Sequence, residues 1–378
     1  MNLLGVHLQL LIGPTVPILA PLKVNEALKS VEVTHKDAGR SGFQLTFQIG
    51  RGPLDLMDFS LLKNPLLQPF NRVILNVFFG IKPIPIMDGI ITNQQLAPSD
   101  DPGSSKLTLT GEDVSVMMDL EQEPREFPGL LETLMVYVVL LPYIPRFGLI
   151  PQVESPQTIK PPTPDERTPQ KPSQLTDLAY LGELATRYGF VFYVEPGPAP
   201  GVNTAYWGPP NRRGTRQKAL SVNMGPNTNI SSISFKYNAL SANRVSYAKK
   251  DGSKETLSSV SPARLPPLAS SPAEMKRKIF YSASDGLDDV QRRARAQGEL
   301  DKSTDEVITA TGELDALRYG QILRPRSLVD LRGAGASFDG TYYVKSVTHK
   351  IDIQKGEYKQ SFTLTREGKG ALTPFVSV

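Results

Sequence analysis

The apolar and polar residues in the first third of the chain alternate as they do in half-buried β-strands. Residues 43–49 place four apolar side chains on one face and three polar ones on the other, which is the period of a strand with one buried face. A strand at 30–34 precedes them, and the turn-forming segment 37–42 joins the two into a hairpin. Residues 71–79 are apolar on both faces, which indicates a strand covered on both sides.

Two more strands are predicted at 86–96 and 106–118, with the loop 98–103 between them. The apolar stretch 8–22 carries three prolines and follows no cationic segment, so it indicates an N-terminal strand rather than a signal peptide. Strands with short connections, and no helical pattern before residue 120, favour a closed or nearly closed antiparallel β-barrel.

A short pattern then occurs twice, 41 residues apart: RFGLIPQVE at 146–154 and RYGFVFYVE at 187–195. Each copy follows an apolar segment of helical length. Gly148 and Gly189 stand where a helix end accepts a residue with positive φ, and the arginine two positions earlier can face the last helical carbonyls. Each copy therefore predicts a helix, a glycine stop and a strand. Because two repeats are too few to bury a solenoid core, the pair must dock on the rest of the chain.

The helix of the second copy has clear start signals and one apolar face. Ser173 or Thr176 can cap it, Asp177 lies in its first turn, and its apolar stripe consists of Leu178, Leu181, Leu184 and Ala185. In the first copy, the apolar run 134–144 is shorter than the ~20 residues that cross a bilayer and is interrupted by Pro142. A buried helix is therefore predicted there.

The C-terminal part returns to strand patterns. Strands are expected at 219–222, 230–237 and 243–249, followed by a helix at 284–297 whose cap and early acidic residues suit the helix dipole. Residues 342–353 and 358–366 then predict a long hairpin around the turn 354–357. Tyr343, Val347 and Ile351 are expected to share one face of it with Tyr358, Phe362 and Leu364 or the neighbours of these residues.

Two proline-rich stretches interrupt these elements. Residues 158–172 contain five prolines and predict a stiff, exposed linker. Residues 257–272 are rich in proline and serine and predict a mobile surface segment.

Composition narrows the class of protein. The chain has 378 residues, enough for two or three domains with cores of their own, and its 33 prolines and 30 glycines indicate many turns. It has no cysteine, which excludes disulfides, thiolate nucleophiles and cysteine metal sites. Its 42 basic and 38 acidic residues are interleaved and form no basic stripe for phosphates. Nucleic acid is therefore not an expected partner.

Residues that could carry catalysis are few. His7, His35 and His349 are far apart in sequence, and each is expected on a strand as a structural residue. Gly333 and Gly335 begin like a dinucleotide-binding loop, but the pattern has Phe338 in place of its third glycine. We predict no catalytic residue, no cofactor-binding residue, no cofactor and no metal ligand.

Acidic residues could supply the carboxylate pair of a glycoside hydrolase: Glu112, Asp113, Glu121, Glu123 and Glu126. No apolar-shielded acid is paired with an exposed base in this segment, so these residues are interpreted as solvated charges around a helix start. Trp207 and Tyr206 leave a third hypothesis open, a module that binds carbohydrate or an effector.

Several of these segments resemble a single family. Residues 173–195 (SQLTDLAYLGELATRYGFVFYVE) closely resemble the helix–strand signature of phage late-control D proteins, the tail-hub family that also forms the N-terminal part of VgrG spikes. Residues 338–349 (FDGTYYVKSVTH) and the closing hairpin are similar to its last barrel. Residues 87–92 (MDGIIT) and 107–115 (LTLTGEDVS) are similar to its first barrel. The resemblance covers nearly the whole chain, with four motifs in the family's order.

The resemblance implies a structural baseplate hub of a contractile injection system or a phage-tail-like particle. The hub is a homotrimer, so that two tube-like barrels per subunit meet a hexameric inner tube. The implied partners are a spike protein, an inner tube or tube-initiator protein, other baseplate proteins, and cargo in the central channel. Because the chain stops at Val378 without the β-helix repeats of a spike, the trimeric spike is expected to be a separate protein. The implied location is the bacterial cytoplasm, within a particle that is released from the cell or docked on a membrane.

We therefore expect an α+β protein, mainly β, with two tube-like antiparallel β-barrel domains and small helix–strand insert domains. Its expected parts are a first barrel at 1–119 completed by 217–240, a duplicated insert at 120–216 with the proline linker 158–172, and a second barrel at 241–378 with the helix 284–297. The hairpins that include 43–49 and 342–353 are expected to build the ring. A tail-associated cell-wall hydrolase remains the alternative function.

Overall fold

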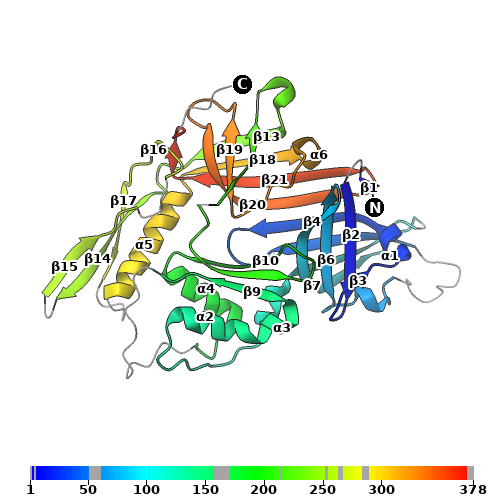
Figure 1. Cartoon of the computed structure of the whole chain (residues 1–378), viewed down its shortest axis with the longest axis horizontal. Coiled ribbons are helices and arrows are strands. Elements are labelled where there is room, and N and C mark those ends of the chain that lie inside the picture. The colour runs from blue at the N-terminus through cyan, green and yellow to red at the C-terminus, as the bar shows by residue number, and fades with distance from the viewer. Residues whose placement is uncertain are drawn as a thin grey trace.

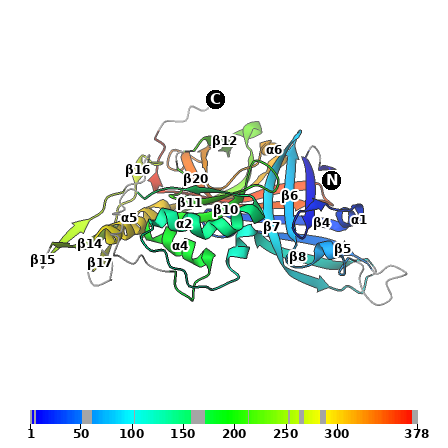
Figure 2. The same ribbon diagram turned by 60° about the horizontal axis from the view of Figure 1, so that its bottom comes forward.

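The computed structural model describes residues 2–3, 6–50, 61–101, 103–156, 171–212, 214–251, 254–262, 267–282 and 289–372. Within them the chain is mainly β with a few helices, which confirms the predicted fold class (Figure 1). The helices α2, α3 and α4 gather on one side of the large sheet (Figure 2). None of the helices in the described part of the chain is both long and apolar enough to span a membrane.

The N-terminal part forms the antiparallel strands that the alternating pattern predicts. The strands expected at 30–34, 43–49, 71–79 and 86–96 are all present. The elements are β1 (Asn2–Leu3), β2 (Val6–Gly13), β3 (Ile18–Leu19), α1 (Leu22–Ala27), β4 (Leu28–Lys36), β5 (Gly42–Ile49), η1 (Pro65–Leu67), β6 (Arg72–Phe79), β7 (Lys82–Ala97), β8 (Ser105–Asp113) and η2 (Val114–Met118).

Two of these strands end earlier than predicted. The strand expected at 8–22 stops at Gly13, because Pro14 and Pro17 follow and cannot donate to a ladder. The strand expected at 106–118 stops at Asp113, whose Oδ1 accepts a hydrogen bond from the Ser115 backbone at 3.0 Å and so caps the 3₁₀ helix η2.

The C-terminal part contributes the remaining strands of the same sheet. They are β12 (Arg216–Ser221), β13 (Ile230–Tyr237), β18 (Ile308–Asp315), β19 (Leu328–Arg332), β20 (Gly340–Asp352) and β21 (Glu357–Arg366), with the short helices η4 (Gly225–Asn227) and α6 (Ala316–Tyr319) between them. Residues 217–240 were expected to complete the first barrel. They pair instead with the C-terminal strands, since β12 is hydrogen-bonded to β19 and β13 to β18.

The main sheet runs in the order β1-β2-β6-β7-β8-β5-β4-β20-β21-β18-β13, and β12 joins it through β19. Among the described strands this hydrogen-bonded path is open, so the two predicted barrel regions form one continuous sheet. The ladder between β4 and β20 joins the N-terminal strands to the C-terminal ones. A single apolar core extends along the whole sheet, from Val6 and Leu8 on β2 to Phe362 and Leu364 on β21.

The predicted hairpin of β20 and β21 is present, with Ile351 opposite Tyr358 and Val347 opposite Phe362. Tyr343 was expected on the same face, and this was wrong. A bulge between Val344 and Ser346 shifts the register, so Val344 faces the main core and Tyr343 packs in a separate cluster.

The repeated pattern forms two helix–strand units, as predicted. The first consists of α2 (Glu132–Leu140), η3 (Leu141–Tyr143), α3 (Ile144–Phe147) and β9 (Leu149–Val153), and the second of α4 (Asp177–Arg187) and β10 (Val191–Pro196). Gly148 and Gly189 both have positive φ, 61° and 63°. The two repeated strands do not pair with each other, because β11 (Asn203–Gly208) lies between them, parallel to β9 and antiparallel to β10.

The insert docks on the N-terminal strands through a shared apolar core. Its buried residues, such as Phe147 and Leu181, pack with Ile90 of β7 and with Val114 and Met118 of η2. This agrees with the expectation that the repeat cannot stand alone.

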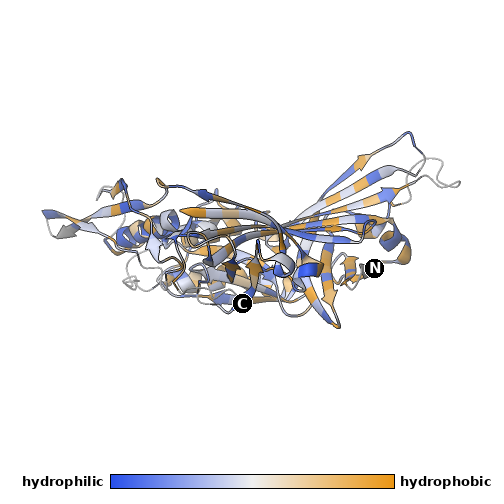
Figure 3. Cartoon of the chain, turned by 90° about the horizontal axis from the view of Figure 1, so that it is seen from above, coloured by the Kyte–Doolittle hydropathy of each residue, from blue (hydrophilic) through white to orange (hydrophobic). Residues whose placement is uncertain are grey.

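A small separate sheet projects from the C-terminal part, on the side away from β1 and β2 (Figures 1 and 3). We call it the arm. It consists of β15 (Lys254–Ser259), β14 (Asn243–Asp251) and β17 (Arg277–Tyr281), covered by α5 (Asp289–Asp305). These strands were expected in the second barrel. The helix predicted at 284–297 continues to Asp305, and residues 284–288 lie outside the described residues.

Parts of the two proline-rich stretches are buried. The linker 158–172 lies mostly outside the described residues, but Lys171 is buried and its ammonium pairs with Asp177. In the stretch 257–272, expected to be mobile, Leu268 and Ala269 are buried because their N–H groups donate to the Glu367 carboxylate. Two short strands, β16 (Ser271–Pro272) and β22 (Gly368–Lys369), pair nearby. Residues 263–266 are not among those described.

Candidate functional site

The apolar loop 14–22 runs from the end of β2 through the two-residue strand β3 to the first residue of α1, and most of its apolar side chains project into solvent. Val16 is 77% exposed and Leu22 72%, and Ile18 and Leu19 are also exposed. Three prolines at 14, 17 and 21 fix much of the backbone of this loop. Exposed apolar side chains that cluster in this way are typical of surfaces that bind another protein.

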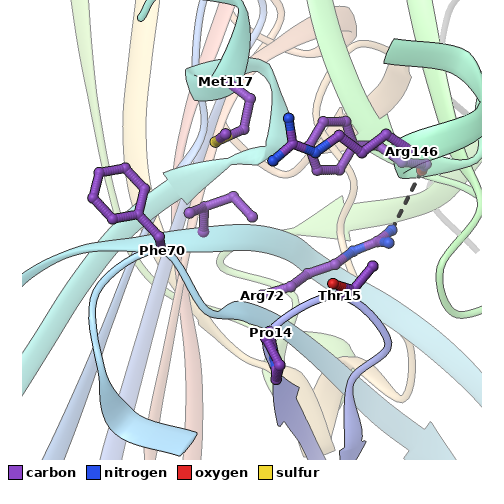
Figure 4. A pocket seen from close by; sticks show the side chains of 8 residues that line it. Pro14, Thr15, Phe70, Arg72, Met117 and Arg146 are labelled. Atoms are coloured by element: carbon purple, nitrogen blue, oxygen red, sulfur yellow. Dashed lines mark hydrogen bonds between the residues drawn. The ribbon is translucent and has the colours of Figure 1, made fainter. Parts of the chain in front are cut away.

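A hollow of about 200 Å³ lies beside this loop, between the N-terminal strands and the insert (Figure 4). Pro14, Phe70 and Met117 contribute apolar side chains to its lining, and Arg72 and Arg146 contribute guanidinium groups. Phe70 is exposed and holds a φ of 66°. Such a backbone angle is costly for an aromatic residue and marks a position whose conformation the surrounding structure imposes.

Arg72, which lines this hollow, forms a buried ion pair with Asp88. Arg72 donates from Nε and Nη2 to the two carboxylate oxygens of Asp88, both at 2.7 Å. The same guanidinium donates to the carbonyl oxygens of Phe147 and Gly201, and Asn203 donates to both Asp88 and Phe147. The pair therefore connects β6 and β7 to the insert.

A second apolar surface lies on α2. Met135, Val136 and Val139 are buried on one side of this helix, as the predicted buried helix requires. The other side is also apolar but lies in solvent. We call it the α2 stripe: Leu134, Tyr137 and Val138 of α2 and Leu141, which follows the helix directly as the first residue of η3, all between 36% and 57% exposed. Their spacing of i, i+3, i+4 and i+7 is that of one helix face, and a face of this kind normally packs against another element.

The main sheet also ends in two edges. Within the described residues β13 pairs only with β18 and forms one end of the sheet, while β1 and β2 form the other. Most side chains of β13 are exposed, among them Ser234 and Lys236. Edge strands with free N–H and C=O groups are ready to pair with a strand of another chain.

Where β4 meets β20, the structure brings together two histidines that sequence reasoning left apart. The rings of His35 and His349 are 5.6 Å apart, edge to face, and both are buried. His35 Nε2 lies 2.7 Å from the Ile86 carbonyl oxygen. Since a carbonyl oxygen only accepts, Nε2 carries the proton and Nδ1 accepts from the Ser41 hydroxyl at 3.0 Å. His349 Nδ1 lies 2.7 Å from the Tyr358 hydroxyl.

Burial keeps both histidines neutral. It lowers the pKa of His349 to about 3 and, together with the nearby His349 and Arg326, lowers the pKa of His35 well below its usual range. Burial also raises the pKa of Asp113 to about 6, although Asp113 accepts hydrogen bonds from Ser41 and Ser115. This cluster joins the two halves of the sheet and presents no exposed nucleophile.

Arg326 fastens three parts of the molecule at this junction. Its Nε donates to the Lys36 carbonyl oxygen at 2.9 Å, and Nη1 lies 3.0 Å from Glu195 of the insert. The guanidinium stacks 3.8 Å from the ring centre of Tyr193. Arg326 has a φ of 61°, and these contacts hold it in that left-handed conformation.

The acidic residues considered for hydrolysis do not form a catalytic pair. Glu112 and the neighbouring Asp119 both bind Arg40, at 2.8 and 3.1 Å, while Asp113 is the buried cap described above. Glu121, Glu123 and Glu126 are exposed. In the described part of the chain, no three histidine or carboxylate side chains are grouped closely enough to hold a metal ion.

Trp207 and Tyr206 do not form a ligand platform. Trp207 is fully buried and donates from Nε1 to the Leu181 carbonyl oxygen, and Tyr206 is stacked on Tyr193. Both belong to the interior of the insert. His7, the third histidine, is an exposed residue on β2 that packs against Phe78.

Sequence reasoning missed the α2 stripe because it assigned the whole apolar run to the interior. The run carries apolar residues on every face of the helix, and a chain of this size rarely covers all faces of a helix at its surface. That all-round pattern was the available signal. The exposed loop 14–22 was missed because its residues suited a strand.

The comparisons with known proteins identify the fold. No family model and no curated protein matches this sequence. Among solved structures, the chain is similar to a tail protein from Neisseria meningitidis at 14% identity, with 97% of this chain and 98% of that chain covered and a TM-score of 0.63. A 43 kDa tail protein of prophage MuSo2 from Shewanella oneidensis is similar at 11% identity, with 96% and 98% covered and a TM-score of 0.62.

A third similar structure is the E. coli c3393 protein, a component of the type VI secretion system, at 11% identity. The alignment covers 92% of this chain and 77% of that chain, with a TM-score of 0.53. Identities this low show the fold alone. The resemblance found in the sequence is thereby confirmed at the level of fold: this chain has the architecture of phage tail proteins and their type VI secretion counterparts.

Proposed function

We propose that this chain, which has the fold of tail proteins, is a structural baseplate hub that joins an inner tube to a spike. The observation that carries the proposal is the extent of the likeness, since two tail proteins are matched over 98% of their own length. The exposed apolar surfaces support it, because they suit a protein whose work is done by contacts with other subunits.

The proposed assembly is a homotrimer. The edges β13 and β1–β2 lie at opposite ends of one sheet, so a contact between them is head to tail and can close into a ring. The hairpins of β4–β5 and β20–β21 would build this ring, and a trimer would present six barrel-like regions to a hexameric tube. The proposed partners are the inner tube or its initiator, a separate spike protein and other baseplate proteins. We further propose that the central channel of the trimer carries cargo and that the particle is assembled in the bacterial cytoplasm.

The hydrolase alternative receives no support from the geometry, because the carboxylates at 112–126 are ion-paired, used as a helix cap, or exposed singly. Zymography of the purified chain is the direct check. A clearing zone that disappears when one of these carboxylates is changed would contradict a purely structural role.

The experiment that tests the hub is to tag the chain in its native producer, sediment high-mass particles and locate the tag by electron microscopy. We expect the tag at one end of a tube, with three copies per particle by quantitative mass measurement. Sheathed particles that sediment without the chain would overturn the proposal. A count other than three would overturn the trimer alone.

A further inference from the structure

The arm presents one face of its sheet to solvent. On the opposite face, Val245 and Tyr247 of β14 pack against Ala296 and Leu300 of α5. Because successive side chains of a strand point to opposite faces, the residues of β14 that alternate with these two point to the other face, which is open at its beginning and covered at Ala248. Arg244 is among them.

Charge is concentrated in this small part of the molecule. Residues 243–282 contain eight basic and three acidic residues, a surplus of five positive charges. The whole chain has a surplus of only four. The strands β14, β15 and β17 account for four of these five positive charges, and α5 has four basic and four acidic residues, so the arm has a surplus of four, equal to that of the whole chain.

Two cations lie side by side on the open face. Arg244 of β14 and Lys278 of β17 are direct cross-strand partners, about 5 Å apart by the usual spacing of strands. Both are exposed, and neither forms an ion pair with any residue that the structure describes. Like charges in directly opposed positions destabilise a sheet, so this arrangement costs stability in the free chain.

Large apolar side chains lie on the same face. Phe280 is 58% exposed and stands opposite Ser246, and Leu257 of β15 is 69% exposed. Along β17, Lys278 and Phe280 therefore both lie on the open face. β17 is also an edge, since β14 is its one strand partner among the described residues. The edge offers backbone groups, and the face beside it offers a cation and an aromatic ring.

We propose that the arm binds an extended acidic segment of a partner protein, which adds to the sheet as a new strand beside β17. A strand in that position has alternate side chains on the open face. One of them, a carboxylate, would neutralise Lys278 and Arg244, and the next, an apolar side chain, would cover Phe280. Main-chain hydrogen bonds supply affinity in this mode of binding, and the alternating side chains supply selectivity. This inference goes beyond the hub function and does not depend on the trimer.

A synthetic peptide of about ten residues, the upper range of ordinary strand lengths, is a suitable probe. The matched peptide has threonine at odd positions and alternating glutamate and isoleucine at even positions, so that both lie on one face. The control has the same composition, with glutamate on one face and isoleucine on the other. We expect the full-length protein to bind the matched peptide, measured by fluorescence anisotropy, about tenfold more tightly than the control and less tightly as salt rises.

Backbone pairing is tested by N-methylation of the peptide. Alternate amides of a strand point to one side, so methylating the amides that face β17 removes the pairing, whereas methylating the other set leaves it. We expect one methylated peptide to lose binding and the other to keep it. Equal behaviour of the two would overturn strand addition.

Variants of the protein locate the site. Lys278→Glu and Arg244→Glu should each lower the affinity for the matched peptide by about tenfold. Lys236→Glu changes an exposed lysine of β13 and alters the charge by the same amount, but it should leave the affinity for the peptide unchanged. Arg244→Ser should lower the affinity for the peptide without lowering the melting temperature of the protein, because it removes the repulsion between Arg244 and Lys278. Binding that survives Lys278→Glu, or that falls equally with Lys236→Glu, would contradict the proposal. The proposal would also be contradicted if the protein bound vesicles that contain phosphatidylserine but did not bind the matched peptide.

Discussion

His35 and His349 show how a single contact can make stability depend on pH. Both rings are buried at the β4–β20 ladder, and among the described residues Arg326 and Arg324 lie near them while no carboxylate forms an ion pair with either ring. The folded chain therefore holds them neutral at a pH where the unfolded chain protonates them.

The free energy of unfolding should fall as the pH falls from about 6.5 to about 3. In this window the folded pKa of His349, about 3, lies below its ordinary value of 6.5, so the unfolded chain binds more protons. The effect of Asp113 has the opposite sign between about 6 and 3.8, because its folded pKa is raised. Urea unfolding across this range should show a net loss on the order of several kcal/mol.

His349→Gln is the matching variant, because glutamine accepts a hydrogen bond from Tyr358 but does not titrate in this range. We expect a shallower loss of stability on acidification than in the unchanged chain, whatever its stability at pH 7. Parallel curves for the two proteins would show that His349 is not the source.

Arg72 and Asp88 form the second case in which one side chain has consequences for several elements. Asp88→Asn leaves the buried guanidinium of Arg72 uncompensated and should cost about 3–5 kcal/mol of unfolding free energy. Denaturant unfolding measures the loss, and limited proteolysis should show faster cleavage of the insert. The double variant Arg72→Met with Asp88→Leu should recover part of the stability; a double variant as weak as the single one would count against the explanation.

At the scale of elements, α4 and α5 approach each other through two glycines. A Cβ on Gly298 of α5 would lie 2.5 Å from the Gly189 nitrogen and 2.8 Å from its Cα. Gly189 is the glycine stop of the second repeat, so the repeat and the arm helix meet at a point where neither has a side chain.

Gly298→Ala should therefore destabilise the chain by about 1–3 kcal/mol through overpacking, although alanine favours a helix over glycine. Gly182→Ala in α4 is the control, because its Cβ meets nothing within 4 Å, and it should stabilise by up to about 1 kcal/mol. Thermal unfolding of both variants measures the difference. If Gly298→Ala raised the melting temperature instead, α4 and α5 would be able to move apart without loss of stability, and the overpacking explanation would be wrong.

Elements with local signals were predictable from the sequence. The helix–glycine–strand units were predicted correctly because Gly148, Gly189 and the Thr176 cap each lie within a few residues of the helix end that they determine. Tyr343 was misplaced because a bulge depends on the partner strand, which the periodicity of one strand does not contain. The buried Leu268 and Ala269 were missed for a similar reason, since the Glu367 carboxylate that holds them is 99 residues away from Leu268.

At the scale of the whole molecule, the apolar surfaces matter most. Leu134→Gln with Leu141→Gln on the α2 stripe should change the unfolding free energy of the chain by less than about 1 kcal/mol, because both side chains are largely exposed. Assembly of the proposed particle should nevertheless be lost, as seen by sedimentation of the tagged chain. Ile81→Gln, at a residue 94% exposed and outside both apolar surfaces, is the control. Normal particles with the double variant would remove the stripe from the assembly interface.

The overall architecture was predictable in class but not in layout. The alternating strands and the family resemblance gave a mainly β protein, which the structure has. The pairing of β12 and β13 with the C-terminal strands was not predictable, because strand order is decided by contacts between residues far apart in sequence. For the same reason the surfaces of the candidate site could be recognised only once the covered side of each element was known.

The ladder between β4 and β20 sets the order in which this protein can be completed during synthesis. Thr34 and Thr348, which share a hydrogen bond across that ladder, are separated by 314 residues. At the usual translation rate of roughly 5–20 residues per second, β4 waits more than about 15 s on the ribosome for its second neighbour. A nascent chain therefore carries β4 paired with β5 on one side and open on the other, in the middle of its largest sheet, until β20 has been made. Termination of synthesis before β20 would leave that edge of β4 open to pairing with other nascent chains.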